Sequence, residues 1–261
     1  MHDSGGVSLP APLVAADGLA AGYGARIVLR DVTFSVRPGE RVAVLGPNGG
    51  GKTTLFRVLT GELPARSGTV QRPARCGVVP QTERSRLDFP VSALDVAAMG
   101  AISRLPWWRP PGRRERAQAL EALHAVGLAD LARATFGDLS GGQRQRVLVA
   151  RALVQDAEVV LLDEPFTGLD SVSADRLEGL LERLAEAGRA LLIATHDVEQ
   201  ARRWDRVLCL NGRQVAYGAP ADALSLPVLE ATYGGTIVPL PGQGERGIVP
   251  PHHHHARRDA G

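Results

Sequence analysis

Short apolar runs alternate along the chain with longer stretches in which apolar residues recur at a helical period. Three runs are almost wholly apolar, which is typical of strands buried on both faces of a sheet: Arg41–Leu45, Val159–Leu162 and Ala190–Thr195. Val32–Val36 alternates apolar and polar residues, as expected of a strand with one exposed face. Each run leads into a glycine- or proline-bearing turn and then a helical pattern. The sequence therefore predicts an α/β fold with a largely parallel sheet.

The pattern changes between residues 90 and 137, where no comparable strand signal occurs. One apolar stripe in this stretch predicts the buried face of an amphipathic helix: Ala117, Leu120, Leu123 and Val126. We therefore expect a helical insertion into the α/β core. Farther along the chain, Asn211 and Gly212 stand between two short apolar runs and predict a β-hairpin.

Composition narrows the choice of class. The 261 residues allow one large domain or a domain with a subdomain, and a net charge of +2 indicates no particular partner. Cys76 and Cys209 lie too far apart to suggest a disulfide framework or a zinc site, which favours a reducing compartment. The N-terminal residues lack the pattern of a signal peptide. No apolar run approaches the roughly 18 residues needed to span a bilayer.

The segment Gly46–Thr54 (GPNGGGKTT) fits the phosphate-binding pattern G-x-x-x-x-G-K-[ST]. It follows a predicted strand and opens a helical pattern that Gly61 is placed to end. In such a loop, backbone N–H groups surround the phosphates, the lysine neutralises their charge and the Thr53 hydroxyl can bind Mg²⁺. The alternative is a glycine turn that matches the pattern by chance, which is expected in ~1% of chains of this length. We expect the nucleotide phosphates to be bound by Gly46, Pro47, Asn48, Gly49, Gly50, Gly51, Lys52, Thr53 and Thr54.

Polar side chains follow the other predicted strands. Asp163 and Glu164 come after Val159–Leu162, at a sheet edge where they would meet the nucleotide. Asp163 suits the Mg²⁺ shell; Glu164, with no obvious neighbour to neutralise it, suits polarising the attacking water. The alternative is an acidic pair that caps the next turn. His196 ends another strand at the same edge, where contact with the γ-phosphate is favoured over a structural role. Gln81, after the strand-like GVVP, is a weaker candidate.

A second glycine-rich helix start lies at Ser140–Gln143, within LSGGQRQRVLVARAL. Helix N-termini bind phosphate through free N–H groups and the helix dipole, but this one has no lysine. Because the chain already has a complete phosphate loop, we infer that this start serves another subunit. In a head-to-tail dimer, Ser140, Gly141 and Gly142 would close over the γ-phosphate held by a second copy of the chain.

In order and spacing, these segments resemble the Walker A, signature and Walker B motifs of ABC-transporter ATP-binding subunits. The resemblance covers about residues 13–235. It implies a P-loop NTPase fold with a RecA-like core, an antiparallel β region and an inserted α-helical subdomain at about residues 90–150. A flexible N-terminus (1–12) and a disordered tail rich in Pro, Gly and His (236–261) would flank this domain.

The resemblance also implies roles for single residues, with ATP as the substrate and Mg²⁺ as the cofactor. Tyr23 matches the aromatic residue that stacks on adenine, and Gln81 matches the Q-loop glutamine that touches the metal and senses a transmembrane partner. Asp170 matches the D-loop residue at the dimer interface, and His196 matches the switch histidine. The implied catalytic residues are Glu164, His196, Lys52 and Gln81. The implied nucleotide contacts include Tyr23, Ser140, Gly141, Gly142 and Gln143. The implied Mg²⁺ ligands are Thr53, Gln81 and Asp163.

Within this family the sequence is most similar to subunits of manganese, zinc and iron importers. That similarity rests on Gly50, Asp88–Gly100 and Leu229–Gly235. Subunits for iron–siderophore and cobalamin uptake share much of the same pattern, and export is a further alternative. The resemblance implies three partners: a second copy, a transmembrane permease and a substrate-binding protein. It also implies a position on the cytoplasmic face of the cell membrane.

An ABC ATPase acting on nucleic acid or the ribosome is the alternative of a different class. Members that act in chromosome condensation carry long coiled coils between the Q-loop and the signature. Here only 57 residues separate Gln81 from Leu139, without a long heptad run. The single cassette and the near-neutral charge also disfavour this class, so we expect no nucleic-acid partner.

Two further features allow more than one interpretation. Trp107 and Trp108 lie in the insertion, where local packing is the commoner role of paired tryptophans and contact with a partner is the alternative. His252–His255 can chelate metal, but a floppy run lacks fixed tetrahedral geometry. A passive tail and a purification remnant are the alternatives to metal sensing.

Overall fold

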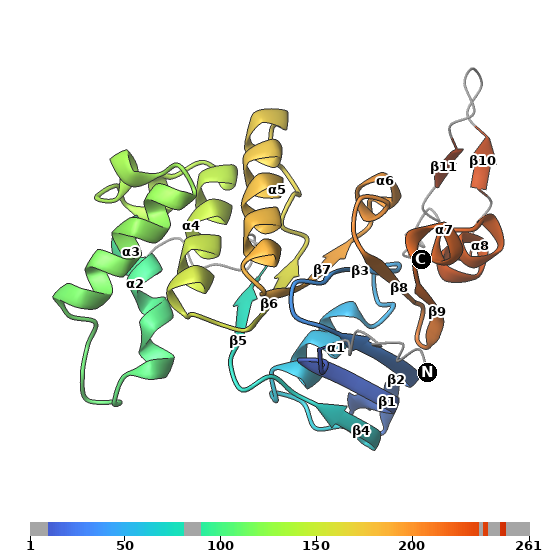
Figure 1. The fold of residues 1–261 in the computed structure, drawn as a ribbon. Helices are drawn as coiled ribbons and strands as arrows, with labels where there is room; N and C mark the ends of the chain where they lie inside the picture. The colour runs from blue at the N-terminus through green and yellow to red at the C-terminus, as the bar shows by residue number, and fades with distance from the viewer. Residues whose placement is uncertain (1–9, 81–89, 235–236, 240–245, 249–261) are drawn as a thin grey trace, which may run out of the picture.

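The computed structural model describes residues 10–80, 90–234, 237–239 and 246–248. A six-stranded sheet lies at its centre, with strand order β5-β6-β7-β3-β8-β9 (Figure 1). All neighbouring strands are parallel except β8 and β9, which form the hairpin predicted at Asn211 and Gly212. The predicted α/β fold with a largely parallel sheet is confirmed. The strands are β3 (Arg41–Leu45), β5 (Cys76–Val79), β6 (Val159–Asp163), β7 (Ala190–Thr195), β8 (Arg206–Leu210) and β9 (Gln214–Gly218).

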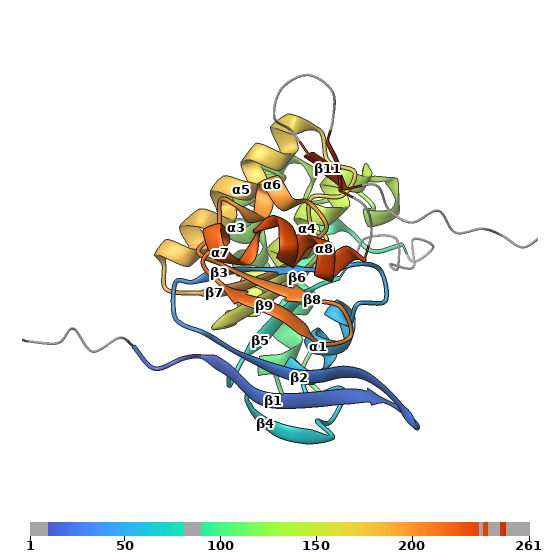
Figure 2. The same ribbon diagram turned by 90° about the vertical axis from the view of Figure 1, so that its right-hand side faces the viewer.

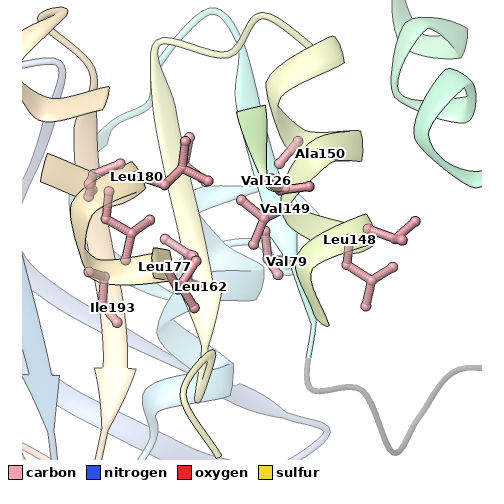
Figure 3. Close-up of a cluster of buried hydrophobic side chains, with 14 of the residues drawn as sticks. Val79, Val126, Leu148, Val149, Ala150, Leu162, Leu177, Leu180 and Ile193 are labelled. Atoms are coloured by element: carbon pink, nitrogen blue, oxygen red, sulfur yellow. The ribbon is translucent and has the colours of Figure 1, made fainter. Parts of the chain in front are cut away.

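The central sheet is buried on both faces, which explains its almost continuous apolar strands. Along β3, Val42 and Val44 pack into one hydrophobic cluster, whereas Ala43 and Leu45 pack into a second cluster on the opposite face. The second cluster lies under the helices and includes Leu162, Leu177 and Ile193 (Figure 3). Alternate residues of one strand thus hold two layers together.

The first cluster joins the central sheet to an antiparallel sheet of order β2-β1-β4 (Figure 2). Its strands are β1 (Val14–Tyr23), β2 (Arg26–Val36) and β4 (Ser67–Gln71), and α1 (Lys52–Leu59) packs into the same cluster. The antiparallel β region implied by the resemblance is therefore present. Pattern alone identified only the second half of β2. Register shifts along β1 interrupt its two-residue alternation, so that strand gave little signal.

The insertion is helical, as predicted. Over the described residues 90–140 it contains no strand, only one isolated bridge between Ser92 and Thr135. Helices α2, α3 and α4 pack on one another beside the central sheet (Figure 1). The elements are α2 (Ala93–Ala98), η2 (Met99–Arg104), α3 (Arg113–Ala125), η3 (Ala129–Leu131), η4 (Phe136–Asp138) and α4 (Gly141–Val154).

The predicted buried stripe of α3 was partly wrong. Leu123 and Val126 are buried, but Ala117 is exposed and Leu120 is 46% exposed. The buried face instead includes Ala119 and Ala122, because α3 packs against both α2 and α4. The sequence offers two apolar stripes at similar spacing, and spacing alone does not choose between them.

The remaining helices cover the same face of the central sheet as the insertion. They are α5 (Ser171–Glu186), α6 (Val198–Ala201), α7 (Pro220–Ala223) and α8 (Leu226–Tyr233). Within the segment predicted to be a disordered tail, β10 (Ile237–Pro239) pairs with β11 (Arg246–Ile248). The run His252–His255 lies outside the described residues. Of the described helices, none combines the length and apolar character required to cross a bilayer.

Candidate functional site

Three loops begin side by side at the carboxyl edge of the central sheet. The register pairs Leu45, at the end of β3, with Thr195 of β7, and it pairs Asp163, at the end of β6, with Ala194. The strands end level with one another, as the sequence predicts for a ligand site at this edge. The residues that follow the three strands are Gly46, Glu164 and His196.

The loop after β3 is held close to the backbone of β8. A Cβ at Gly46 would lie 2.1 Å from the carbonyl oxygen of Leu210, so only glycine fits there. Gly51 precedes α1 with φ 107°, a left-handed conformation that also favours glycine. Helix α1 has no side-chain cap and no acidic residue in its first turn. Its first N–H groups are therefore available to an anion such as phosphate.

Lys52 places a positive charge inside this loop. Its side chain is 7% exposed, and Nζ donates hydrogen bonds to the carbonyl oxygens of Gly46 (2.6 Å) and Pro47 (3.3 Å). Burial lowers the pKa of Lys52, while the carboxylates of Glu164 and Asp163 act in the opposite direction. The ammonium thus lies between the loop carbonyls and the acidic pair, where it can bind a further anion.

Thr53 and Asp163 bring two oxygen ligands together. Thr53 Oγ1 lies 3.5 Å from Asp163 Oδ2, so the hydroxyl at the start of α1 faces the carboxylate at the end of β6. A hydroxyl and a carboxylate oxygen suit a hard cation such as Mg²⁺. The donor set therefore fits the predicted metal, and Gln81, the third predicted ligand, lies outside the described residues.

Glu164 has neighbours that the sequence did not suggest. Its Oε2 accepts a hydrogen bond from the Thr167 hydroxyl (3.3 Å) and lies 3.7 Å from His196 Nδ1. Thr167, three residues away, carries no charge, and His196 follows the adjacent strand. The cation that interacts with the Glu164 carboxylate is Lys52. Glu164 also has φ 50°, a left-handed conformation that is uncommon outside glycine and concentrates at functional sites.

A cavity of ≈ 610 Å³ opens in front of this loop. Tyr23 lies in its wall, 41% exposed, and its hydroxyl accepts a hydrogen bond from Arg57 Nη1 (3.2 Å). Arg26 and Val28 of β2 also line the cavity, although no sequence motif indicated them. The pairing of Tyr23 with Arg26 across the β1–β2 turn would have indicated Arg26 had the hairpin been recognised. The wall consists of Tyr23, Arg26, Val28, Pro47, Asn48, Gly49, Gly51, Lys52, Thr53, Thr54, Asp163 and Glu164.

The second glycine-rich helix start lies elsewhere. Ser140 caps α4: its Oγ accepts from the Gln143 N–H (3.2 Å), and its own N–H donates to Gln143 Oε1 (2.9 Å). Ser140 and Gly141 are exposed, and nothing lies within 4 Å of a Cβ placed on Gly141. Neither residue lines the cavity around Lys52. Within one chain, the two predicted phosphate contacts are therefore separate.

Asp170 caps the helix that follows the acidic pair. Its carboxylate accepts from the Ser173 N–H (2.8 Å) and hydroxyl (2.9 Å), and these hydrogen bonds lower the pKa of Asp170.

In the insertion, Trp107 and Trp108 are 92% and 70% exposed and contact each other edge to face, with ring centroids 5.8 Å apart. Packing into a core does not account for this pair.

Comparison with known proteins relates this geometry to a family. The model of the ABC transporter family matches residues 29–167, which include the phosphate loop, the second helix start and the acidic pair. The chain belongs to the ABC transporter family. It is an ATP-binding subunit that hydrolyses ATP, as the motifs predict.

Two curated relatives match nearly the whole ABC subunit. The zinc transport system ATP-binding protein TroB of Treponema pallidum is 40% identical over 240 residues, which cover 88% of this chain and 90% of TroB. The manganese transport system ATP-binding protein MntB of Halalkalibacterium halodurans is 35% identical over 247 residues, which cover 91% of this chain and 98% of MntB.

Solved ABC structures share the fold. An ABC transporter in an inward-facing conformation has a TM-score of 0.80 and 29% identity, covering 87% of this chain and 91% of that one. The dimeric bacterial ABC transporter cassette MJ0796 has a TM-score of 0.70 and 26% identity, covering 79% of this chain and 98% of that one. The predicted fold class, with its P-loop core and helical insertion, is therefore confirmed.

Proposed function

We propose that this ATPase energises the uptake of a divalent metal ion, such as manganese, zinc or iron, through a separate permease. The observation that carries the proposal is the agreement of two relatives, named as zinc and manganese transport subunits, over about nine tenths of the chain. The match extends beyond the core motifs to the ends of the domain. Near-complete coverage supports a shared role in a transport system.

The geometry of the site supports a division of labour among its residues. The adenine ring would stack on Tyr23, and the phosphates would lie over the free N–H groups of α1 beside Lys52. Thr53 and Asp163, with Gln81, would hold Mg²⁺, which neutralises charge on the phosphate oxygens. Glu164 would accept a proton from the attacking water, and His196 would orient its carboxylate and touch the γ-phosphate.

The signature residues would act in a second copy of the chain. Ser140 and Gly141 are exposed and lie apart from the cavity, and MJ0796 is a related cassette whose structure is dimeric. In the proposed dimer, the α4 start of one copy closes over ATP held by Lys52 of the other, with Asp170 near the interface. Hydrolysis then breaks the phosphate bridge, and the dimer reopens.

A membrane partner is needed to turn this cycle into transport. We place the subunit on the cytoplasmic face of the membrane, bound to permease subunits that receive metal from a substrate-binding protein. Gln81 and the insertion would form the contact with the permease. The exposed Trp107–Trp108 pair supports a contact role for the insertion, because exposed aromatic residues are enriched at protein interfaces.

Cellular metal content tests the proposal. Cells that depend on this subunit are grown under metal limitation, and manganese, zinc and iron are measured for the wild type and Glu164→Gln. A selective fall of one metal in the variant is expected and would identify the cargo. Glu186→Gln, which removes an exposed carboxylate from α5, is the matched control. A rise would indicate export, and unchanged levels of all three metals would reject a metal cargo.

A further inference from the structure

A second pocket, outside the nucleotide site, has three arginines in its lining. It has a volume of ≈ 250 Å³ and lies where the end of α3 meets α4 and α5. None of its residues lines the cavity around Lys52. Its charged and titratable lining consists of His124, Arg146, Asp175, Arg176 and Arg183.

Arg146 is the buried member of this group. Its side chain is 7% exposed, and Nη1 donates to the carbonyl oxygen of Val126 (3.2 Å). Its Nε is buried and has no hydrogen-bond partner among the described residues. Burial lowers the pKa of Arg146, and the charge of Arg176 lowers it further, opposed only by Asp170. A buried charge is costly unless it is paired, so an anion beside this guanidinium would be stabilising.

The arginines face one small space. The Nη1 atoms of Arg146 and Arg176 lie 3.7 and 3.9 Å from the position that a Cβ would take on Gly127. Arg183 enters the same lining from the next turns of α5. Across the described residues, no carboxylate oxygen lies within 4.0 Å of a side-chain nitrogen of these three arginines. Asp175 is the one acid in the lining, so the positive charge exceeds its compensation.

We propose that this pocket binds a small multivalent oxyanion of the phosphate class. Planar guanidinium groups donate paired hydrogen bonds to phosphate oxygens, and here three of them converge against a single lining carboxylate, that of Asp175. The volume suits a small anion and is below that of common drug-sized ligand sites. The occupant would connect α4, which starts within the signature, to α5, which Asp170 caps. The proposal does not rest on the proposed metal uptake.

Inorganic pyrophosphate is a suitable probe. The full-length chain carrying Lys52→Ala, which removes the cation of the nucleotide site, is titrated with pyrophosphate in a calorimeter. The same protein with Arg176→Gln and Arg183→Gln tests the pocket; both side chains are exposed, so the fold is expected to persist, which thermal unfolding verifies. The matched control adds Arg113→Gln and Arg114→Gln instead, removing the same charge from the exposed start of α3.

We expect the pocket variant to bind pyrophosphate about tenfold or more weakly than the Lys52→Ala protein, because two charged hydrogen-bond donors are lost. The control is expected to change affinity by less than about twofold, as distant exposed charges are largely screened. Equal weakening in the pocket variant and the control would mean general electrostatic attraction and would overturn the proposal. Absence of pyrophosphate binding to the Lys52→Ala protein would overturn it as well. Parallel titrations with orthophosphate and ADP distinguish a free phosphate from a nucleotide as the ligand.

Discussion

The two glycine-rich helix starts of this chain, α1 and α4, are built in different ways. At α1 the loop is folded against β8, the helix has no side-chain cap, and buried Lys52 faces Asp163 and Glu164. At α4 the start is exposed and closed by a capping box. The first site offers the ammonium of Lys52, a hydroxyl beside a carboxylate, and free N–H groups. The second offers only N–H groups and a hydroxyl, which suits a phosphate whose charge is already neutralised elsewhere.

The largest effect should come from the acidic side of the α1 site. Glu164→Gln is expected to lower the rate of ATP hydrolysis by about 10²–10⁴-fold, because general-base catalysis contributes that much. ATP binding should persist, so the variant should accumulate a dimer with ATP, measured by light scattering. Activity within a few fold of wild type would assign the proton transfer to another group. A variant that stays monomeric with ATP would contradict the proposed dimer, in which two chains enclose the nucleotide.

The α4 site is tested by a substitution that the single chain tolerates. Gly141→Ala meets no atom within 4 Å and needs no unusual backbone angle, so its unfolding temperature should not fall. In a dimer, the methyl group would hold the partner's phosphate away from the backbone. The hydrogen bonds from the α4 backbone to this phosphate would be lost, and a hydrogen bond to a charged group contributes about 1.5–3 kcal/mol. Hydrolysis would then be slower by roughly 10- to 100-fold.

Gly218→Ala, at the end of β9, is the matched control, since it also meets nothing within 4 Å. It should leave both stability and ATP hydrolysis unchanged. If Gly141→Ala behaves like Gly218→Ala in ATPase and dimerisation assays, then α4 does not approach a phosphate. The difference between the two helix starts would then be only a difference in capping.

The position of the α1 site at one edge of the sheet can be predicted from the sequence, because it depends on local pattern. The strands before Gly46, Asp163 and His196 are short apolar runs that end in polar residues, and a parallel sheet aligns such ends. Contacts between segments are not visible in the same way. The approach of Gly46 to Leu210 and the contact of His196 with Glu164 follow from strand order.

Other features depend on packing that no local pattern encodes. The buried face of α3 is set by α2 and α4 together, so Leu120 is exposed although its spacing is correct. The arginine-lined pocket combines His124, Arg146 and Arg176 from three helices, and its residues show no spacing that marks a site. Arginines in amphipathic helices ordinarily point to solvent, so only the structure shows that these converge.

In the proposed nucleotide site, the contact of adenine with Tyr23 should contribute less to ATP affinity than the contacts of the phosphates with the α1 loop. Tyr23→Ala is expected to weaken ATP binding by about 1–3 kcal/mol, the range measured for stacking of a base on an aromatic ring. Tyr23→Phe retains the ring and loses only the hydrogen bond from Arg57, so its affinity should stay near that of wild type. Fluorescence titration with ATP compares the two variants. Equal weakening would show that the hydroxyl, rather than the ring, is needed.

Two capping boxes allow a finer test of the α4 start. Ser92 caps α2 with Asp95 in the same arrangement as Ser140 with Gln143. Ser92→Ala and Ser140→Ala should each lower the free energy of unfolding by about 1 kcal/mol, the usual value for a lost cap. Only Ser140→Ala should also reduce ATP-dependent dimerisation, because its hydroxyl would face the partner's phosphate. Similar dimerisation in both variants would leave Ser140 a helix cap alone.

The smallest expected effect uses an unusual property of the chain: Lys52 is its only lysine. An amine-reactive reagent can therefore modify just Lys52 and the terminal amine, which mass spectrometry separates. Because burial lowers the pKa of Lys52, the folded chain holds more neutral amine at alkaline pH than an exposed lysine would. Labelling of Lys52, normalised to its plateau, should accordingly reach its midpoint at a lower pH in the folded chain than in urea. A folded-state midpoint at or above the urea value would mean that the carboxylates of Glu164 and Asp163 outweigh burial at Lys52.

The effect of ADP on this labelling tests phosphate binding. A bound phosphate favours the protonated form of Lys52, so ADP should slow the labelling. In the monomer, Gly141→Ala should leave the labelling unchanged. Equal labelling with and without ADP would remove Lys52 from the phosphate site and with it the charge difference between the two helix starts.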